Sequence, residues 1–132
     1  MNSYLLDSNI LIEYLNGQDK IVSYVDSISK SAICNISIIS KIELISFPKL
    51  IAPEVKKILS FLENFKNIML TDEIAIKAAE IRRKKRLKLP DAVIASTAIV
   101  LNATLVSRDE VFEQLTSVKY VNPLASTEPR KI

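Results

Sequence analysis

The chain has 132 residues, of which 48% are hydrophobic, and its formal net charge is only +3. This size and composition are typical of one compact domain with a buried core. Because the sequence has no histidine and a single glycine, it excludes hydrolases with a histidine base, histidine-ligated zinc sites and glycine-rich nucleotide-binding loops. An active site must therefore be built from carboxylates, hydroxyls, amides and cations.

The sequence predicts a cytoplasmic protein with no membrane segment. The amino-terminal residues do not form a signal-peptide pattern, and no apolar stretch reaches the roughly 20 residues that span a bilayer. The longest apolar stretch, residues 92–101, is interrupted by Ser96 and Thr97, and we expect it to form a buried helix. The only cysteine, Cys34, has no partner for an internal disulfide, which suits a reducing compartment.

Predicted strands and helices alternate along the chain. We expect strands, in chain order, over residues 3–6, 32–36, 67–70, 104–106 and 118–121. Between them we expect helices that begin, in chain order, at Ser8 or Asn9, near Ile21, at Ser37, at Pro53, at Thr71 and at Pro90. This order predicts an α/β fold, a three-layer α/β/α sandwich around a parallel sheet of about five strands. Residues 1–132 are expected to form a single domain, with an irregular tail over 122–132.

Four acidic residues lie where predicted elements end or begin. Asp7 and Asp109 follow strands, Asp91 lies in the first turn of a helix, and Glu43 lies among apolar residues that suggest a buried setting. Taken singly, the three aspartates have ordinary interpretations as caps or turn residues. Ligands of parallel sheets bind beyond the carboxyl ends of the strands. We therefore expect the four acids to meet at that edge.

A cluster of carboxylates indicates a divalent cation. Without one, the negative charges repel each other and some of the acids take up protons. Ligands that are all oxygen atoms suit Mg²⁺ or Mn²⁺, and such ions activate water and orient phosphates. The four acids therefore predict a metal-dependent site that hydrolyses phosphodiester bonds without a histidine.

Four segments, in order, resemble the motifs of PIN-domain nucleases. They are YLLDSNILIEYL (residues 4–15), SIISKIEL (37–44), LPDAVIASTAIV (89–100) and ATLVSRDEVF (103–112). Within that family the chain is most similar to the small toxins of VapBC-type toxin–antitoxin pairs. The resemblance implies a Mg²⁺-dependent (or Mn²⁺-dependent) endoribonuclease, a homodimer, and inhibition by a cognate antitoxin.

The resemblance also implies roles for individual residues. Asp7, Glu43, Asp91 and Asp109 would be the metal-binding and catalytic acids. Asn9 and Ser107 would support them by hydrogen bonding. A metal-activated water would attack the phosphorus in line and leave a 5′-phosphate and a 3′-hydroxyl.

Three positions depart from the usual pattern of the family. Ser107 replaces a threonine, and Asn102 lies near the place of a glycine that usually precedes the fourth motif. Many members carry an asparagine and then a later aspartate in the last motif, whereas this chain has Asp109, Glu110 and Phe112. Either Asp109 or Glu110 is therefore a candidate for the fourth acid of the site.

A basic stretch over residues 82–88 precedes the third motif. Arg82, Arg83, Lys85 and Arg86 are candidates for binding the RNA backbone. Stabilisation of the end of a helix by its cations is an equally good explanation. The amphipathic helices within residues 13–28 and 54–65 are either core elements or surfaces for the antitoxin and the dimer.

Two other functions agree with these features. A housekeeping PIN-domain nuclease of RNA processing would carry the same acids without an antitoxin. A non-catalytic nucleic-acid-binding module would keep the fold alone, but the presence of all four acids favours catalysis. The sequence does not identify the RNA target.

Overall fold

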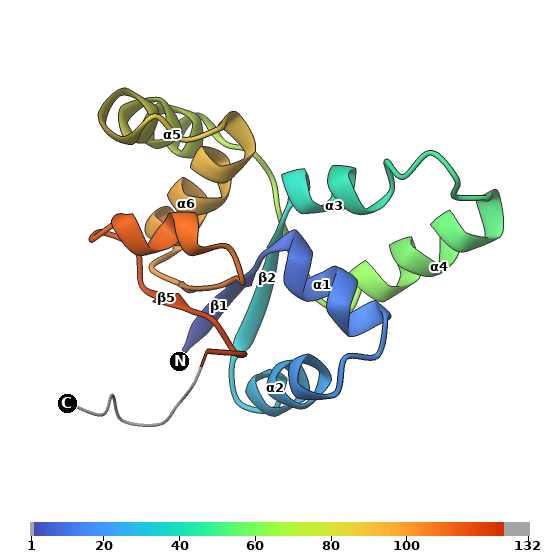
Figure 1. Cartoon of the computed structure of the whole chain (residues 1–132). Helices are drawn as coiled ribbons and strands as arrows, with labels where there is room; N and C mark the ends of the chain where they lie inside the picture. The colour runs from blue at the N-terminus through green and yellow to red at the C-terminus, as the bar shows by residue number, and fades with distance from the viewer. Residues whose placement is uncertain (1, 126–132) are drawn as a thin grey trace.

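The computed structural model describes residues 2–125, and five parallel strands form its centre (Figure 1). The strands are β1 (Ser3–Leu6), β2 (Ile33–Ser37), β3 (Lys66–Ile68), β4 (Thr104–Val106) and β5 (Tyr120–Val121). The helices are α1 (Ser8–Leu15), α2 (Asp19–Ser29), α3 (Ile38–Leu44), α4 (Ala52–Leu62), α5 (Asp72–Lys85), α6 (Leu89–Leu101) and the 3₁₀ helix η1 (Glu110–Gln114). Every strand except the last is followed by at least one helix, as parallel pairing requires.

The strand order is β3-β2-β1-β4-β5, so β1 lies in the middle of the sheet. Every pairing between neighbouring strands is parallel. The carboxyl ends of β1, β2 and β4 therefore lie at the same edge of the sheet. This edge receives the residues that follow β1 and β4.

Alternating side chains of the strands supply two separate cores. Leu5 and Leu105 pack with α5, α6 and Phe112 on one face. Leu6 and Val106, the next residue of each strand, pack with α1, α2 and Leu62 of α4 on the other. The predicted three-layer α/β/α sandwich is confirmed.

The predicted elements are all present, although their bounds differ by a few residues. The first helix begins at Ser8, one of its two predicted starts. Its N-cap is Asp7 rather than Ser8 or Asn9, and Asp7 accepts a hydrogen bond from the Ser8 amide, in agreement with the ordinary interpretation of this aspartate as a cap. η1 was not predicted, since five residues of 3₁₀ helix carry no clear periodicity. Most of the tail predicted to be irregular, residues 126–132, lies outside the described residues.

In the described part of the chain, no helix has the length and apolar character that crossing a bilayer requires. The 13-residue α6 is buried over most of its length instead, as its sequence predicted.

The turn between α6 and β4 depends on a left-handed residue. Asn102 ends α6 with φ = 52° and ψ = 42°. Glycine adopts this conformation without strain, and asparagine tolerates it better than other side chains do. Asn102 therefore suits this turn, near the position where the family resemblance predicts a glycine.

We expect Asn102→Gly to keep or slightly raise the free energy of unfolding, and Asn102→Val to lower it by about 1–2 kcal/mol. Chemical denaturation of both variants measures this difference. Asn16→Gly is the matched control, because Asn16 also ends a helix but has φ = −81°. That control should be destabilised, and equal effects of glycine at both positions would contradict the role of φ.

Candidate active site

Asp7 lies at the junction of β1 and α1 and is the most buried acid of the predicted site, with 8% of its surface exposed. Its amide donates to the Val106 carbonyl of β4, and its own carbonyl accepts from the first turn of α1. The backbone on both sides of the carboxylate is therefore fixed. The side chain lies against Ser107, which follows β4, rather than in solvent.

Hydrogen bonds hold both oxygens of the Asp7 carboxylate. The Ser8 amide donates to Oδ1 at 2.8 Å, and the Ser107 hydroxyl donates to Oδ2 at 2.7 Å. Asn9 Nδ2 lies 3.4 Å from the same Oδ2 and donates to Ser107 Oγ at 3.2 Å. The structure thus brings Asn9 and Ser107 together around Asp7, although they are 98 residues apart in the sequence.

The loop after β4 is tied to α1 through the same residues. The Arg108 amide donates to Asn9 Oδ1 at 3.2 Å, and the Asp109 amide donates to Ser107 Oγ at 3.0 Å. The Ser107 hydroxyl, with no exposed surface, therefore makes three contacts at once. These contacts set the backbone position of Asp109 relative to Asp7.

Glu43 is joined to the site by a residue that the sequence did not single out. The Ser8 hydroxyl donates to Glu43 Oε1 at 2.7 Å, which connects α1 to α3. The sequence carries only a weak signal for this role, because Ser8 follows Asp7 but the direction of its hydroxyl depends on how α1 packs.

The buried setting expected for Glu43 is wrong. Glu43 is exposed, and its neighbour Ile42 is 53% exposed. Only Ser40 and Leu44 of α3 are buried, because one face of this seven-residue helix meets the rest of the protein. Glu43 faces outward at the mouth of the site.

Asp91 is half-buried in the first turn of α6, where burial raises its pKa above the ordinary value. The charge of Asp109 adds to this rise, Lys88 opposes it, and Glu43 contributes less. Asp109 itself is exposed and caps η1 by accepting from the Val111 amide at 3.0 Å. Of the two candidates for the fourth acid, it is Asp109 and not Glu110 whose charge acts on Asp91.

The pKa of Asp7 is raised from 3.8 to about 6. Burial is the largest cause, and the charges of Glu43 and Asp91 add to it. The hydrogen bonds from Ser107 and Ser8 oppose the rise. A buried carboxylate therefore faces two further acids, an environment that a cation would stabilise.

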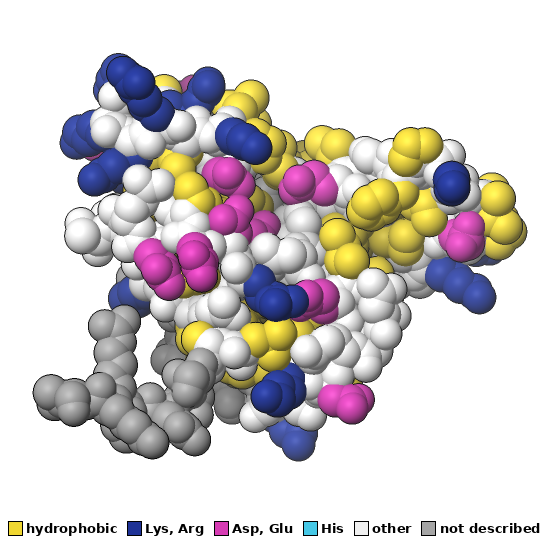
Figure 2. Space-filling model, in the orientation of Figure 1, with side chains coloured by type: hydrophobic (Ala, Val, Ile, Leu, Met, Phe, Trp, Pro, Cys, Tyr) yellow, Lys and Arg dark blue, Asp and Glu magenta, His cyan; other side chains and the backbone are white. Residues whose placement is uncertain are grey.

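The donor set fits a hard divalent cation in its chemistry. Asp7, Glu43, Asp91 and Asp109 offer only oxygen atoms, which Mg²⁺ and Mn²⁺ prefer. Acidic side chains gather on one face between α6, α3 and η1 (Figure 2). Over residues 2–125, however, no three acidic or cysteine side chains are close enough to hold an ion together. The exposed Glu43 and Asp109 are the two whose side chains have room to turn.

The sequence also did not single out the ion pair between Arg108 and Glu13. The Arg108 guanidinium donates to Glu13 Oε1 on α1, one turn beyond Asn9. The second oxygen, Oε2, is buried and has no hydrogen-bond partner among the described residues. This pair holds the loop that carries Asp109 against α1. The signal in the sequence that could have indicated this ion pair was the basic residue Arg108 inside the fourth motif, beside Asp109.

The basic residues predicted to bind RNA lie apart from these contacts. Arg82, Arg83 and Lys85 are exposed in the last turn of α5, and Arg86 ends that helix. Two residues separate Arg86 from the start of α6, whose first turn carries Asp91.

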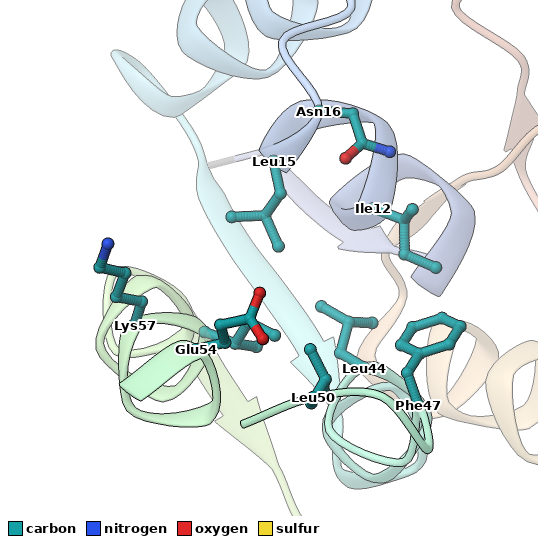
Figure 3. A pocket seen from close by; sticks show the side chains of 9 residues that line it. Ile12, Leu15, Asn16, Leu44, Phe47, Leu50, Glu54 and Lys57 are labelled. Carbon is teal, nitrogen blue, oxygen red and sulfur yellow. The ribbon is translucent and has the colours of Figure 1, made fainter. Parts of the chain in front are cut away.

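A second feature is an apolar groove between α1, α3 and α4 (Figure 3). It has a volume of about 340 Å³, and its apolar lining consists of Ile12, Leu15, Leu44, Phe47, Leu50 and Ile58. Phe47 is 51% exposed and Leu15 is 42% exposed. Glu54 and Lys57 stand at one side of it. Apolar side chains of this number at the surface are typical of a binding surface.

The chain is similar to a known family and to solved structures. A family model described as "PIN domain" matches residues 4–117. A toxin–antitoxin complex from Klebsiella pneumoniae contains a chain of 26% identity with a TM-score of 0.80, and the alignment covers 91% of this chain and 97% of that one. FitAcB from Neisseria gonorrhoeae contains a chain of 26% identity with a TM-score of 0.76, and the alignment covers 93% of this chain and 99% of that one.

A third similar structure has lower identity. It is VapBC2 from Rickettsia felis bound to a DNA fragment from the promoter, with 23% identity, a TM-score of 0.77, and coverage of 91% of this chain and 98% of that one. At this identity the likeness concerns the fold alone. No curated protein gives a significant sequence match.

We expect Asp7 to lower the stability of the metal-free protein as the pH rises. Its pKa is higher in the folded chain than in the unfolded chain, so the folded chain holds the proton more tightly. The resulting stabilisation is complete below about pH 4 and is lost as the pH rises through about 6. The difference between the two pKa values corresponds to about 3 kcal/mol.

Urea denaturation of the wild type and of Asp7→Asn in chelator, between pH 4 and 8, tests this expectation. The asparagine cannot ionise, so the stability of the variant relative to the wild type should rise across this range and then level off. Asp26→Asn controls for general charge effects, because Asp26 lies on α2 and accepts a hydrogen bond from Tyr14. A constant difference between wild type and Asp7→Asn would contradict the raised pKa.

We expect Ser107→Ala to raise the pKa of Asp7 further, because the Ser107 hydroxyl is the strongest of the groups that lower it. The Asp109 amide would also lose its acceptor. An NMR titration of the side-chain carboxyl carbons reads the pKa directly. Ser107→Thr keeps the hydroxyl and is the control, and an unchanged pKa in the alanine variant would show that this hydrogen bond is not formed.

Proposed function

Because the chain belongs to the PIN-domain family, we propose that it is a divalent-metal-dependent endoribonuclease and the toxin of a type II toxin–antitoxin pair. The resemblance found in its four motifs is confirmed by the match over residues 4–117 and by the shared fold. The proposal concerns what the match leaves open: the metal, the RNA substrate, the roles of the residues and the partners.

One observation carries the catalytic part of the proposal. Asp7 is a buried carboxylate whose two oxygens are fixed by hydrogen bonds, and the charges of Glu43 and Asp91 act on it. Without a cation, such a group of carboxylates lowers the stability of the protein, and a bound cation removes this cost. A bound Mg²⁺ or Mn²⁺ would supply a water of lowered pKa and neutralise charge on the phosphate.

The residues of the chain divide this work between them. Asp7 presents an oxygen in a fixed position, because Ser107 and Ser8 orient its carboxylate. Glu43, on α3, and Asp109, just before η1, are exposed. Asp91 is less exposed than these two acids and more exposed than Asp7. Asn9 positions the loop after β4 rather than contacting substrate. The site would therefore orient a phosphodiester between one fixed acid and two adjustable ones.

The partner part of the proposal depends on the groove in Figure 3. The solved toxin–antitoxin complex from Klebsiella pneumoniae contains a chain of this fold. We assign the groove between α1, α3 and α4 to apolar side chains of a cognate antitoxin. The chain would also form a homodimer and act in the cytoplasm. Met69, Leu70 and Ile76 are exposed on another part of the surface and could serve the dimer.

Cleavage of single-stranded RNA by the purified protein tests the catalytic proposal. We expect cleavage with Mn²⁺ or Mg²⁺ and none in EDTA. Asp7→Asn and Asp91→Asn should each lower the rate by about 100-fold or more, because a neutral amide cannot offset the charge of the ion. Sequencing of the cleaved ends should find 5′-phosphates.

Asp26→Asn is the matched control, since Asp26 lies on α2 and accepts a hydrogen bond from Tyr14 instead of facing the site. It should cleave at the wild-type rate. Full activity of Asp7→Asn, or cleavage that persists in EDTA, would contradict the mechanism. Folding of each variant is checked by its thermal unfolding before rates are compared.

A further inference from the structure

The structure divides the basic residues of α5 into two groups. Lys77 and Lys84 lie 3.7 and 3.3 Å from Glu80 Oε1, and both line a hollow together with Lys85. Arg82, Arg83 and Arg86 line a different hollow of about 470 Å³. The lysine group therefore contains a carboxylate that offsets its charge, whereas the arginine group has none among its lining residues.

The backbone at the α5–α6 corner holds the arginines in place. Arg86 is left-handed, with φ = 51°, and its amide donates to the Arg82 carbonyl at 3.1 Å. Arg82 Nε donates to the Leu87 carbonyl at 3.1 Å. Leu87 is buried, with 4% of its surface exposed, and anchors the corner. The Arg82 guanidinium thus has one nitrogen tied to the protein and two terminal nitrogens that no described residue accepts from.

Stabilisation of the helix end does not account for this much positive charge. Residues 82–88 contain six cations, whereas the carboxyl end of a helix carries a partial charge of about −0.5. The remaining cations repel each other and lower the stability of the corner. Such a cluster is explained by an anion that binds to it. Guanidinium groups match phosphate oxygens in pairs, which lysines do not.

The hollow and the acids lie on adjoining parts of the surface. Only four residues separate Arg86 from Asp91 in the sequence, and a basic side chain over the α5–α6 corner borders the acidic face in Figure 2. The charge of Lys88, at this corner, acts on Asp91. We propose that Arg82, Arg83 and Arg86 bind backbone phosphates of the RNA strand and so guide its scissile bond to Asp91, while Lys77, Lys84 and Lys85 take no part. This inference rests on the proposed function and assigns a phosphate-binding site to it.

Binding of a fluorescein-labelled single-stranded RNA, followed by anisotropy, tests the assignment. All measurements use the Asp7→Asn background in EDTA, so that the RNA stays intact. Two triple variants are compared, Arg82→Gln/Arg83→Gln/Arg86→Gln and Lys77→Gln/Lys84→Gln/Lys85→Gln. Both lower the net charge by the same amount on the same helix. The lysine variant also removes both ion-pair partners of Glu80 and leaves its negative charge unpaired. It is therefore the more demanding control, because that charge by itself would weaken RNA binding.

We expect the arginine variant to bind about 100-fold more weakly at 0.1 M salt. The slope of log affinity against log salt should fall by about 2, since each phosphate contact on a single strand contributes about 0.7. The lysine variant should lose less than about threefold. Equal losses in the two variants, or no loss in the arginine variant, would overturn the assignment.

The two proposals fail in different ways. A loss of binding that is confined to the arginine variant supports the phosphate-binding role of the hollow. Failure of the protein with Asp7 intact to cut RNA would count only against the proposed nuclease. If the protein with Asp7 intact cleaves RNA in a metal-dependent way but the arginine variant binds RNA as before, the phosphate-binding role of the hollow is overturned and the proposed nuclease is not. Thermal unfolding and circular dichroism of both triple variants establish that a loss of binding is not a loss of fold.

Discussion

The burial of the Asp7 carboxylate is the constraint on which the rest of the site depends. The residue ends β1, caps α1 and donates its amide to β4, so its position is fixed by three elements at once. With burial this complete, its charge is tolerated only through the hydrogen bonds from Ser8 and Ser107. The identity of Ser107 follows from this need, because its side-chain hydroxyl is the donor, whereas Ser8 donates through its backbone amide.

The other acids of the site differ from Asp7 in their freedom. Glu43 and Asp109 are exposed and belong to short elements, a seven-residue helix and the start of η1. Each of their carboxylates accepts a hydrogen bond at one oxygen, from the Ser8 hydroxyl and the Val111 amide, whereas both oxygens of Asp7 accept hydrogen bonds. In the proposed site, the acid held at both oxygens would keep the position of the reacting group constant, and the two held at one oxygen would adjust to the substrate.

The sequence predicted the layers of the fold because buried parallel strands and amphipathic helices have distinct patterns. The positions of Asp7 and Asp91 at element ends were also readable, since a strand end and a proline mark them. The exposure of Glu43 was not, because α3 is apolar on nearly every side and periodicity cannot select its buried face. The Ser8 hydroxyl and the Arg108–Glu13 pair depend on contacts across the fold, which no local pattern contains.

The separation of the acids along the chain has a consequence for the timing of activity. The Ser107 hydroxyl reaches Asp7 from a position 100 residues later, directly after β4, the strand that pairs with β1. During synthesis the chain therefore emerges from the ribosome with Asp7 exposed and its site incomplete until β4 is added. If the proposed function holds, a site assembled in this way stays inactive in the nascent chain until the residues that follow β4 have been made.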